Sequence, residues 1–101
     1  AYLLAQNAGV DPAKVREALL GGFAYSKILE VHGQRMLEKS YHPGFKARLH
    51  AKDLRIALES ALTNHVNLPG AELANEYMQQ LVKEGNGDLD SAAIAKIIGS
   101  G

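Results

Sequence analysis

The clearest pattern of hydrophobic and polar positions runs from Pro43 to Leu58, with the sequence PGFKARLHAKDLRIAL. A Pro-Gly turn opens this stretch, and a helix is predicted to begin after it, nearer Lys46, and to end near Asn64. With about 100° between successive side chains, the helix has two opposed faces. The charged face comprises Arg48, Lys52, Arg55 and Glu59, and the core face comprises Leu54, Ala57, Leu58, Ala61 and Leu62. The pattern therefore predicts an amphipathic helix packed on one side only.

Two residues do not fit this simple division into a solvated face and a core face. Phe45 lies beside the start of the charged face. Asp53 points about 100° away from Lys52, next to Leu49, Ile56 and Ala57. A carboxylate among apolar neighbours is costly unless it is paired, so we expect Asp53 to have a partner.

Helix signals also dominate the chain before Pro43. The predicted helices are Tyr2–Ala8, a segment from Pro12 to the glycine pair at 21–22, and Lys27–Lys39. Asp11 and Ser26 are the expected N-caps of the second and third helices, and Gly9 is expected to stop the first.

The remaining helices follow the central one after short connections. Pro69 is predicted to start a helix with Ala71, Ala74, Tyr77, Met78, Leu81 and Val82 on its buried side. Gly85-Asn86-Gly87 ends it, and either Asp90 or Ser91 caps a last helix. No segment shows sustained alternation of the strand type. The predicted fold is therefore all-α, an irregular bundle of about five or six helices within one domain, residues 1–101.

Composition narrows the possible partners. The chain has 101 residues, a formal net charge of +0, 47% hydrophobic residues and no cysteine. A neutral chain without a basic block argues against nucleic acid as the main partner, and we give a DNA-binding function little weight. The absence of a long apolar run argues against a membrane span, and the absence of cysteine is compatible with the cytoplasm.

The chain lacks a self-contained catalytic motif. It has no nucleophile elbow, no Walker loop and no dinucleotide-binding glycine motif. His50 and Asp53 are three residues apart on one helix, but an ordinary hydrogen-bonded or exposed histidine is the better interpretation, and no metal site is expected. The charged face of the central helix is either a solvated surface with an Arg55–Glu59 pair, or a surface that contacts an anionic ligand held by another domain.

The ordered set of short motifs resembles the C-terminal domain of the β-hydroxyacid dehydrogenases. This family includes 3-hydroxyisobutyrate dehydrogenase and tartronate semialdehyde reductase (2-hydroxy-3-oxopropionate reductase), within the 6-phosphogluconate dehydrogenase superfamily. The motifs that carry the resemblance are Gly9-Val10-Asp11, Gly21-Gly22, Ser26, Pro43-Gly44-Phe45, Lys52-Asp53-Leu54, Ala57-Leu58, Leu68-Pro69, Gly85-Asn86-Gly87 and Asp90. One departure is Ala92, where many relatives have a polar residue.

The resemblance implies an oxidoreductase that interconverts a short β-hydroxy acid and its semialdehyde with NADP or NAD. The cofactor would be bound mainly by an upstream Rossmann domain, which, with the catalytic lysine, would precede Ala1, so this chain alone is expected to be inactive. Lys52 would face the cofactor, and Phe45 and Asp53 would lie near the substrate. The domain would also form homo-oligomers. The alternative function is a non-catalytic helical dimerisation or interaction module.

Overall fold

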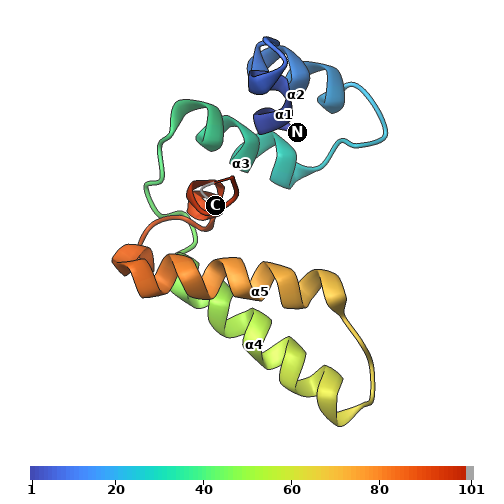
Figure 1. Cartoon of the computed structure of the whole chain (residues 1–101), viewed down its shortest axis with the longest axis vertical. Coiled ribbons are helices and arrows are strands. Elements are labelled where there is room, and N and C mark those ends of the chain that lie inside the picture. The colour runs from blue at the N-terminus through green and yellow to red at the C-terminus, as the bar shows by residue number, and fades with distance from the viewer. Residues whose placement is uncertain (100–101) are drawn as a thin grey trace. The chain divides into compact units, whose positions relative to one another are not determined.

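The computed structural model of the protein describes residues 1–99 and confirms the all-α fold class over them. The described residues form two compact units, one from Ala1 to Ser40 and one from Tyr41 onward, each of which is considered separately (Figure 1). None of the helices in residues 1–99 has both the length and the apolar character needed to cross a lipid bilayer.

The first unit contains three helices: α1 (Tyr2–Asn7), α2 (Pro12–Leu20) and α3 (Lys27–Glu38). Both expected N-caps are present. The Asp11 carboxylate accepts a hydrogen bond from the amide of Ala13 at 3.0 Å, and the Ser26 hydroxyl accepts one from the amide of Leu29 at 2.9 Å. These bonds satisfy amides that have no partner within their own helices, which explains why α2 and α3 begin where the sequence predicts.

A glycine in the middle of α3 allows close packing within this unit. The hydroxyl of Tyr2 donates a hydrogen bond to the carbonyl oxygen of Gly33 at 3.1 Å. A Cβ atom at position 33 would lie 2.7 Å from that hydroxyl oxygen, which is too close for an unshifted contact. Gly33 therefore lowers the helix propensity of α3, but it leaves room for the hydrogen bond that joins α1 to α3.

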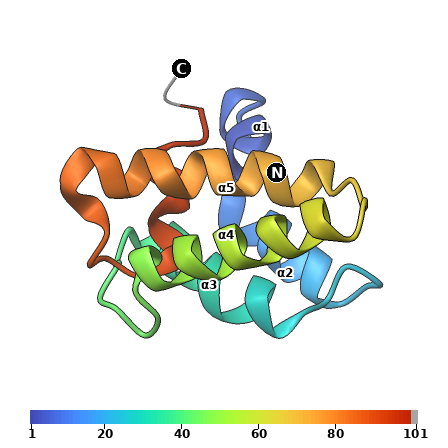
Figure 2. The same ribbon diagram turned by 90° about the horizontal axis from the view of Figure 1, so that it is seen from below.

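The second unit contains α4 (Ala47–Thr63), α5 (Pro69–Leu81), a π-helical turn η1 (Val82–Asn86) and a 3₁₀ helix η2 (Ser91–Lys96). Helices α4 and α5 lie side by side as a hairpin (Figure 2). The predicted helix stop is confirmed, because Gly85 takes a left-handed conformation with φ 87°. The chain then turns back, so that η2 packs against both α4 and α5.

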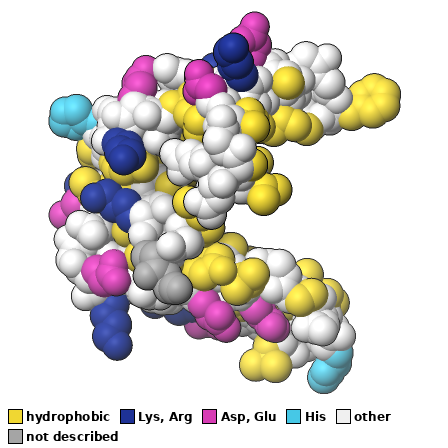
Figure 3. All heavy atoms as spheres, turned by 45° about the horizontal axis from the view of Figure 1, so that its top comes forward, with side chains coloured by type: hydrophobic (Ala, Val, Ile, Leu, Met, Phe, Trp, Pro, Cys, Tyr) yellow, Lys and Arg dark blue, Asp and Glu magenta, His cyan; other side chains and the backbone are white. Residues whose placement is uncertain are grey.

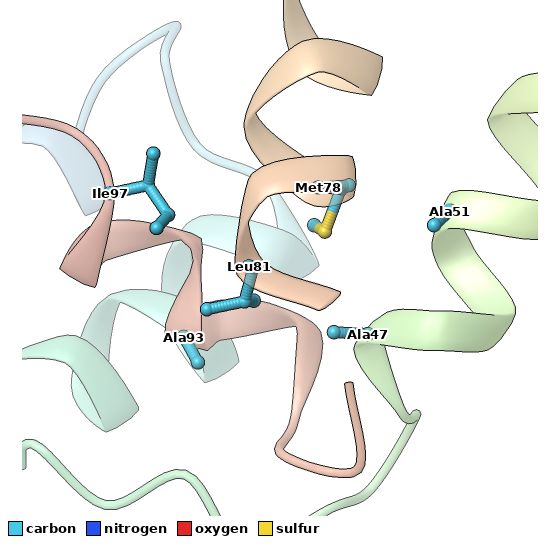
Figure 4. Packing of buried hydrophobic residues seen from close by; sticks show 6 residues of the cluster. All are labelled: Ala47, Ala51, Met78, Leu81, Ala93 and Ile97. Carbon is cyan, nitrogen blue, oxygen red and sulfur yellow. The ribbon is translucent and has the colours of Figure 1, made fainter. Parts of the chain in front are cut away.

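The core of this unit forms where α4, α5 and η2 meet. Its buried residues are Ala47, Ala51, Met78, Leu81, Ala93 and Ile97. Leu81 is fully buried and points between Ala47 of α4 and Ala93 of η2 (Figure 4). Small side chains on α4 and η2 leave room for the large Leu81 and Met78 side chains of α5, as efficient interior packing requires.

The predicted core face of α4 is partly wrong. Leu54, Leu58 and Ala61 are at least partly buried as expected, but Ala57 is exposed and Leu62 is 80% exposed. The buried stripe instead passes through Ala47 and Ala51. The reason is the direction of each side chain around the helix, at about 100° per residue. Ala57 and Leu62 lie to either side of the face that carries Ala47, Ala51, Leu54, Leu58 and Ala61. Other large hydrophobic side chains of the chain are exposed as well, and the space-filling view shows hydrophobic atoms on the surface (Figure 3).

Replacing Leu81 by alanine is expected to destabilise the protein strongly, whereas replacing Leu62 by alanine is expected to change little. The first change leaves a cavity in a closed core and should cost about 2–5 kcal/mol of unfolding free energy. The second removes an exposed side chain and should stay within about 0.5 kcal/mol. Urea unfolding of the two variants provides the comparison, and equal losses would contradict the core described above.

Candidate functional site

Two segments that are far apart in the sequence pair at the start of α4. Lys46 and Asp90 form an isolated antiparallel bridge. The amide of Ser91 donates to the carbonyl oxygen of Phe45 at 2.9 Å, and the amide of Asp90 donates to the carbonyl oxygen of Tyr41 at 2.9 Å. The loop that carries Phe45 is therefore held by backbone bonds to the segment before η2.

The carboxylate of Asp90 is at the centre of this pairing and is fully buried. One oxygen, Oδ1, accepts hydrogen bonds from the amides of Gly44 and Phe45, each at 3.0 Å. The other, Oδ2, accepts one from the amide of Ala92 at 2.9 Å. Of the two N-caps that the sequence left open, Asp90 rather than Ser91 is used. Its bonds to the Phe45 loop were not predicted, because the sequence contains only the local capping signal.

The first amides of α4 donate hydrogen bonds to backbone carbonyl groups. The amide of Ala47 donates to the carbonyl oxygen of Leu89, and the amide of Arg48 donates to that of Gly87, both at 2.8 Å. No side chain caps this helix. Because these amides already have acceptors, the N-terminus of α4 is poorly suited to binding a phosphate, although helix N-termini often do so.

Phe45 is fixed through its backbone but presents its ring to solvent. The side chain is 42% exposed, and its ring lies edge-on to that of His50, with 5.9 Å between centroids and 60° between planes. A partly exposed aromatic ring on a backbone held from both sides can form one wall of a binding site.

The charged face of α4 is exposed as predicted, but its cations differ in their partners. The Nε atom of Arg48 donates to Oδ1 of Asp88 at 2.9 Å, and Nζ of Lys46 lies 3.7 Å from the same oxygen. The hydrogen bond from Arg48 and the charge of Lys46 lower the pKa of Asp88. Lys52 has no hydrogen bond or ion pair within the described part of the chain.

The predicted Arg55–Glu59 pair is not formed among residues 1–99. Both side chains are exposed, and an exposed pair of this kind gains little because it orders two long side chains in water. Lys52 and Arg55 are thus cations of the charged face whose ammonium and guanidinium groups remain available for other contacts.

Asp53 has no partner in the described chain, contrary to expectation. It is exposed, and so are its neighbours Ile56, at 54%, and Ala57, whereas Leu49 is half-buried. Water therefore reaches the carboxylate, and the desolvation that would demand a partner is absent. Among residues 1–99, no three histidine, aspartate or glutamate side chains come together in a way that could hold a metal ion.

Solved structures define the class of fold. The chain superposes on a 3-hydroxyisobutyrate dehydrogenase from Salmonella typhimurium with a TM-score of 0.87 and 24% identity, over 93% of this chain and 33% of that one. It superposes on the 3-hydroxyisobutyrate dehydrogenase of Mycobacterium tuberculosis with a TM-score of 0.86 and 17% identity, over 98% of this chain and 36% of that one. The chain thus has a helical fold found in dehydrogenases of this type.

Sequence comparison then gives the family. The family described as NAD-binding of NADP-dependent 3-hydroxyisobutyrate dehydrogenase matches residues 1–98, and the chain belongs to it. It is 46% identical to the 2-hydroxy-3-oxopropionate reductase of Escherichia coli K12 over 97% of its own length. It is 36% identical to a probable 3-hydroxyisobutyrate dehydrogenase-like protein of Arabidopsis thaliana over 91% of its length. The chain spans 34% and 28% of these two relatives. The predicted resemblance is therefore confirmed.

Replacing Arg48 by glutamine is expected to raise the pKa of Asp88 toward its ordinary value, because the hydrogen bond that favours the carboxylate is lost. The pKa of Asp88 is lowered in the folded protein, so its contribution to stability is present above the pKa of the unfolded chain. That contribution is lost as the pH falls through the lower, folded value. Carboxyl-carbon NMR titration of Asp88 gives the midpoint directly.

The matched control for this titration is Arg55→Gln, which removes a cation without an ion pair from the same helix face. It should leave the midpoint of Asp88 nearly unchanged. An unchanged midpoint in Arg48→Gln would show that Arg48 does not set the pKa of this carboxyl group.

Proposed function

We propose that this chain is the C-terminal substrate-cleft and oligomerisation domain of an NAD(P)-dependent oxidoreductase. The enzyme would interconvert a short β-hydroxy acid and its semialdehyde. The observation that carries the proposal is the 46% identity to 2-hydroxy-3-oxopropionate reductase over nearly the whole chain. The chain spans 34% of that relative. In the proposed enzyme, the dinucleotide-binding fold and the general acid-base lysine would belong to another part of the protein.

The residues on α4 fit a contact with a dinucleotide. Lys52 is exposed, cationic and free of ion pairs in the described chain, so it loses no existing pair when an anionic or hydroxyl-rich group approaches. Arg48, one turn earlier, is engaged by Asp88 and is less suited to this role. When bound, the nicotinamide ring of NADP or NAD supplies the hydride acceptor or donor for the reaction.

Phe45 and Asp53 are the residues that we place on the substrate side. Phe45 excludes water from the reacting atoms, which protects a hydride transfer from competing reactions. Asp53 lies about 100° around the helix from Lys52, so it orients a substrate hydroxyl group or pairs with a cation of the other domain, rather than contacting the same atom as Lys52. Substrates of the right class are small hydroxy acids and semialdehydes such as tartronate semialdehyde, hydroxyisobutyrate and succinic semialdehyde.

The proposal is tested by comparing the intact protein with the 101-residue chain. Each is assayed for NADPH and NADH oxidation with tartronate semialdehyde and with succinic semialdehyde. Turnover is expected for the intact protein only. If the intact protein neither binds NAD(P) nor turns over any of these acids, the dehydrogenase proposal fails and a non-catalytic interaction module is favoured.

Replacing Lys52 by glutamine in the intact enzyme should raise the KM for the cofactor by about tenfold, as expected for the loss of one charge-assisted contact. Lys83→Gln is the matched control, because Lys83 is an exposed lysine of the same unit without an ion pair in the described chain.

A measurement that is independent of activity uses acylation of lysine side chains, read by mass spectrometry. NADP is expected to protect Lys52 but not Lys83 in the intact protein. Equal labelling of Lys52 with and without the cofactor would contradict its assigned contact.

Replacing Phe45 by alanine should lower kcat/KM for the hydroxy acid by about tenfold or more, because an apolar wall of the site is removed. Phe45→Leu should retain more activity than Phe45→Ala. The control is Phe23→Ala, since Phe23 is the other phenylalanine of the chain and its side chain is fully exposed. Steady-state kinetics of the three variants give kcat/KM for each. An equal loss of kcat/KM in Phe45→Ala and Phe23→Ala would argue against a special role for Phe45.

A further inference from the structure

Backbone bonds to a buried carboxylate fix the loop that carries Phe45. The amides of Gly44 and Phe45 both donate to Oδ1 of Asp90, from positions 46 and 45 residues away in the chain. The carbonyl oxygen of Phe45 accepts from the amide of Ser91 at 2.9 Å. The peptide groups on both sides of the Phe45 α-carbon are therefore bonded to one short segment.

The ring of Phe45 is held much less firmly than its backbone. Phe45 is 42% exposed, and its ring lies edge-on to the ring of His50. Packing alone does not fix a side chain with this exposure, so its direction depends on the backbone from which it projects.

We propose that Asp90 is a positioning residue of this enzyme, which acts on the substrate through Phe45 by fixing the backbone at Gly44 and Phe45. The inference rests on the proposed function, because it assigns Phe45 to the substrate side. Asp90 is fully buried, and both of its carboxylate oxygens accept hydrogen bonds from backbone amides. Two charge-assisted hydrogen bonds to adjacent amides define the orientation of a peptide group more sharply than neutral bonds do.

The same carboxylate couples this loop to η2. Because Oδ2 accepts from the amide of Ala92, a shift of η2 alters the position of Oδ1 and hence of the Phe45 loop. A site that must be held to within fractions of an ångström benefits from such a rigid link, since small misplacements of catalytic groups lower rates considerably.

The first measurement uses the unmodified intact enzyme. Hydrogen exchange, read residue by residue by NMR, should show the amides of Gly44 and Phe45 protected by about two orders of magnitude or more relative to an unstructured chain. Unprotected amides at both positions would overturn the proposal, whether or not any variant folds, and this result does not depend on the enzyme's activity.

The second measurement is a double-mutant cycle with Asp90→Asn and Phe45→Ala in the intact enzyme. Asparagine keeps the shape of the side chain but places an amide group where one oxygen accepted a bond. Asp90→Asn alone should lower kcat/KM for the hydroxy acid by about tenfold or more and leave the KM for NADP within about twofold. In the Phe45→Ala background, the same change should alter kcat/KM by no more than about twofold.

Asp11→Asn is the control for loss of a carboxylate N-cap, because Asp11 caps α2 through the amide of Ala13 and lies in the other unit. It should leave kcat/KM within about twofold. If Asp90→Asn lowers kcat/KM equally in both backgrounds, Asp90 acts through general stability and the proposal is wrong. If the unmodified enzyme itself shows no NAD(P)-dependent turnover, the proposed function fails instead, and the exchange result still decides the geometry.

Discussion

The second unit depends on hydrogen bonds between residues 44–48 and residues 87–91, with the Asp90 carboxylate at their centre. Removing a carboxylate from water costs on the order of several kcal/mol, so a fully buried aspartate persists only where donors surround it. Here the donors are backbone amides of Gly44, Phe45 and Ala92. The same segment supplies the carbonyl groups that cap α4. The start of the helix, the loop before it and η2 are consequently fixed together.

The two faces of helix α4 contribute differently to stability. Ala47 and Ala51 are buried against Met78 and Leu81, so this face contributes to the core. The face that carries Lys52 takes no part in the core and is exposed. Substitutions on the exposed face should therefore cost little folding free energy, whereas substitutions on the alanine face should cost more. Such a separation suits a helix that forms one wall of a cleft.

The chain belongs to the 3-hydroxyisobutyrate dehydrogenase family, and this membership is the basis for interpreting these features. The relatives are about three times as long as this chain. In the proposed division of the enzyme, the other part binds most of the dinucleotide and supplies the acid-base lysine. In the same proposal, this chain would add Lys52 as a contact for the cofactor and Phe45 as an aromatic wall for the substrate. Asp90, the proposed positioning residue, lies far from Phe45 in the sequence but accepts a hydrogen bond from its amide.

Local chemistry in the sequence determined the helices, their N-caps at Asp11 and Ser26, the stop at Gly85 and the exposed face of α4. These features depend on residues within about one helical turn, where a capping oxygen or a missing Cβ acts directly. The family motifs around Lys52 could also be identified from the sequence. Only the tertiary structure decided that Leu62 is exposed, that Arg48 pairs with Asp88 and that Asp90 holds the Phe45 loop. The first outcome depends on which face of α4 is covered by α5, and the other two depend on groups that the segment after α5 brings back to α4. No local signal in the sequence specifies contacts made across 40 or more residues.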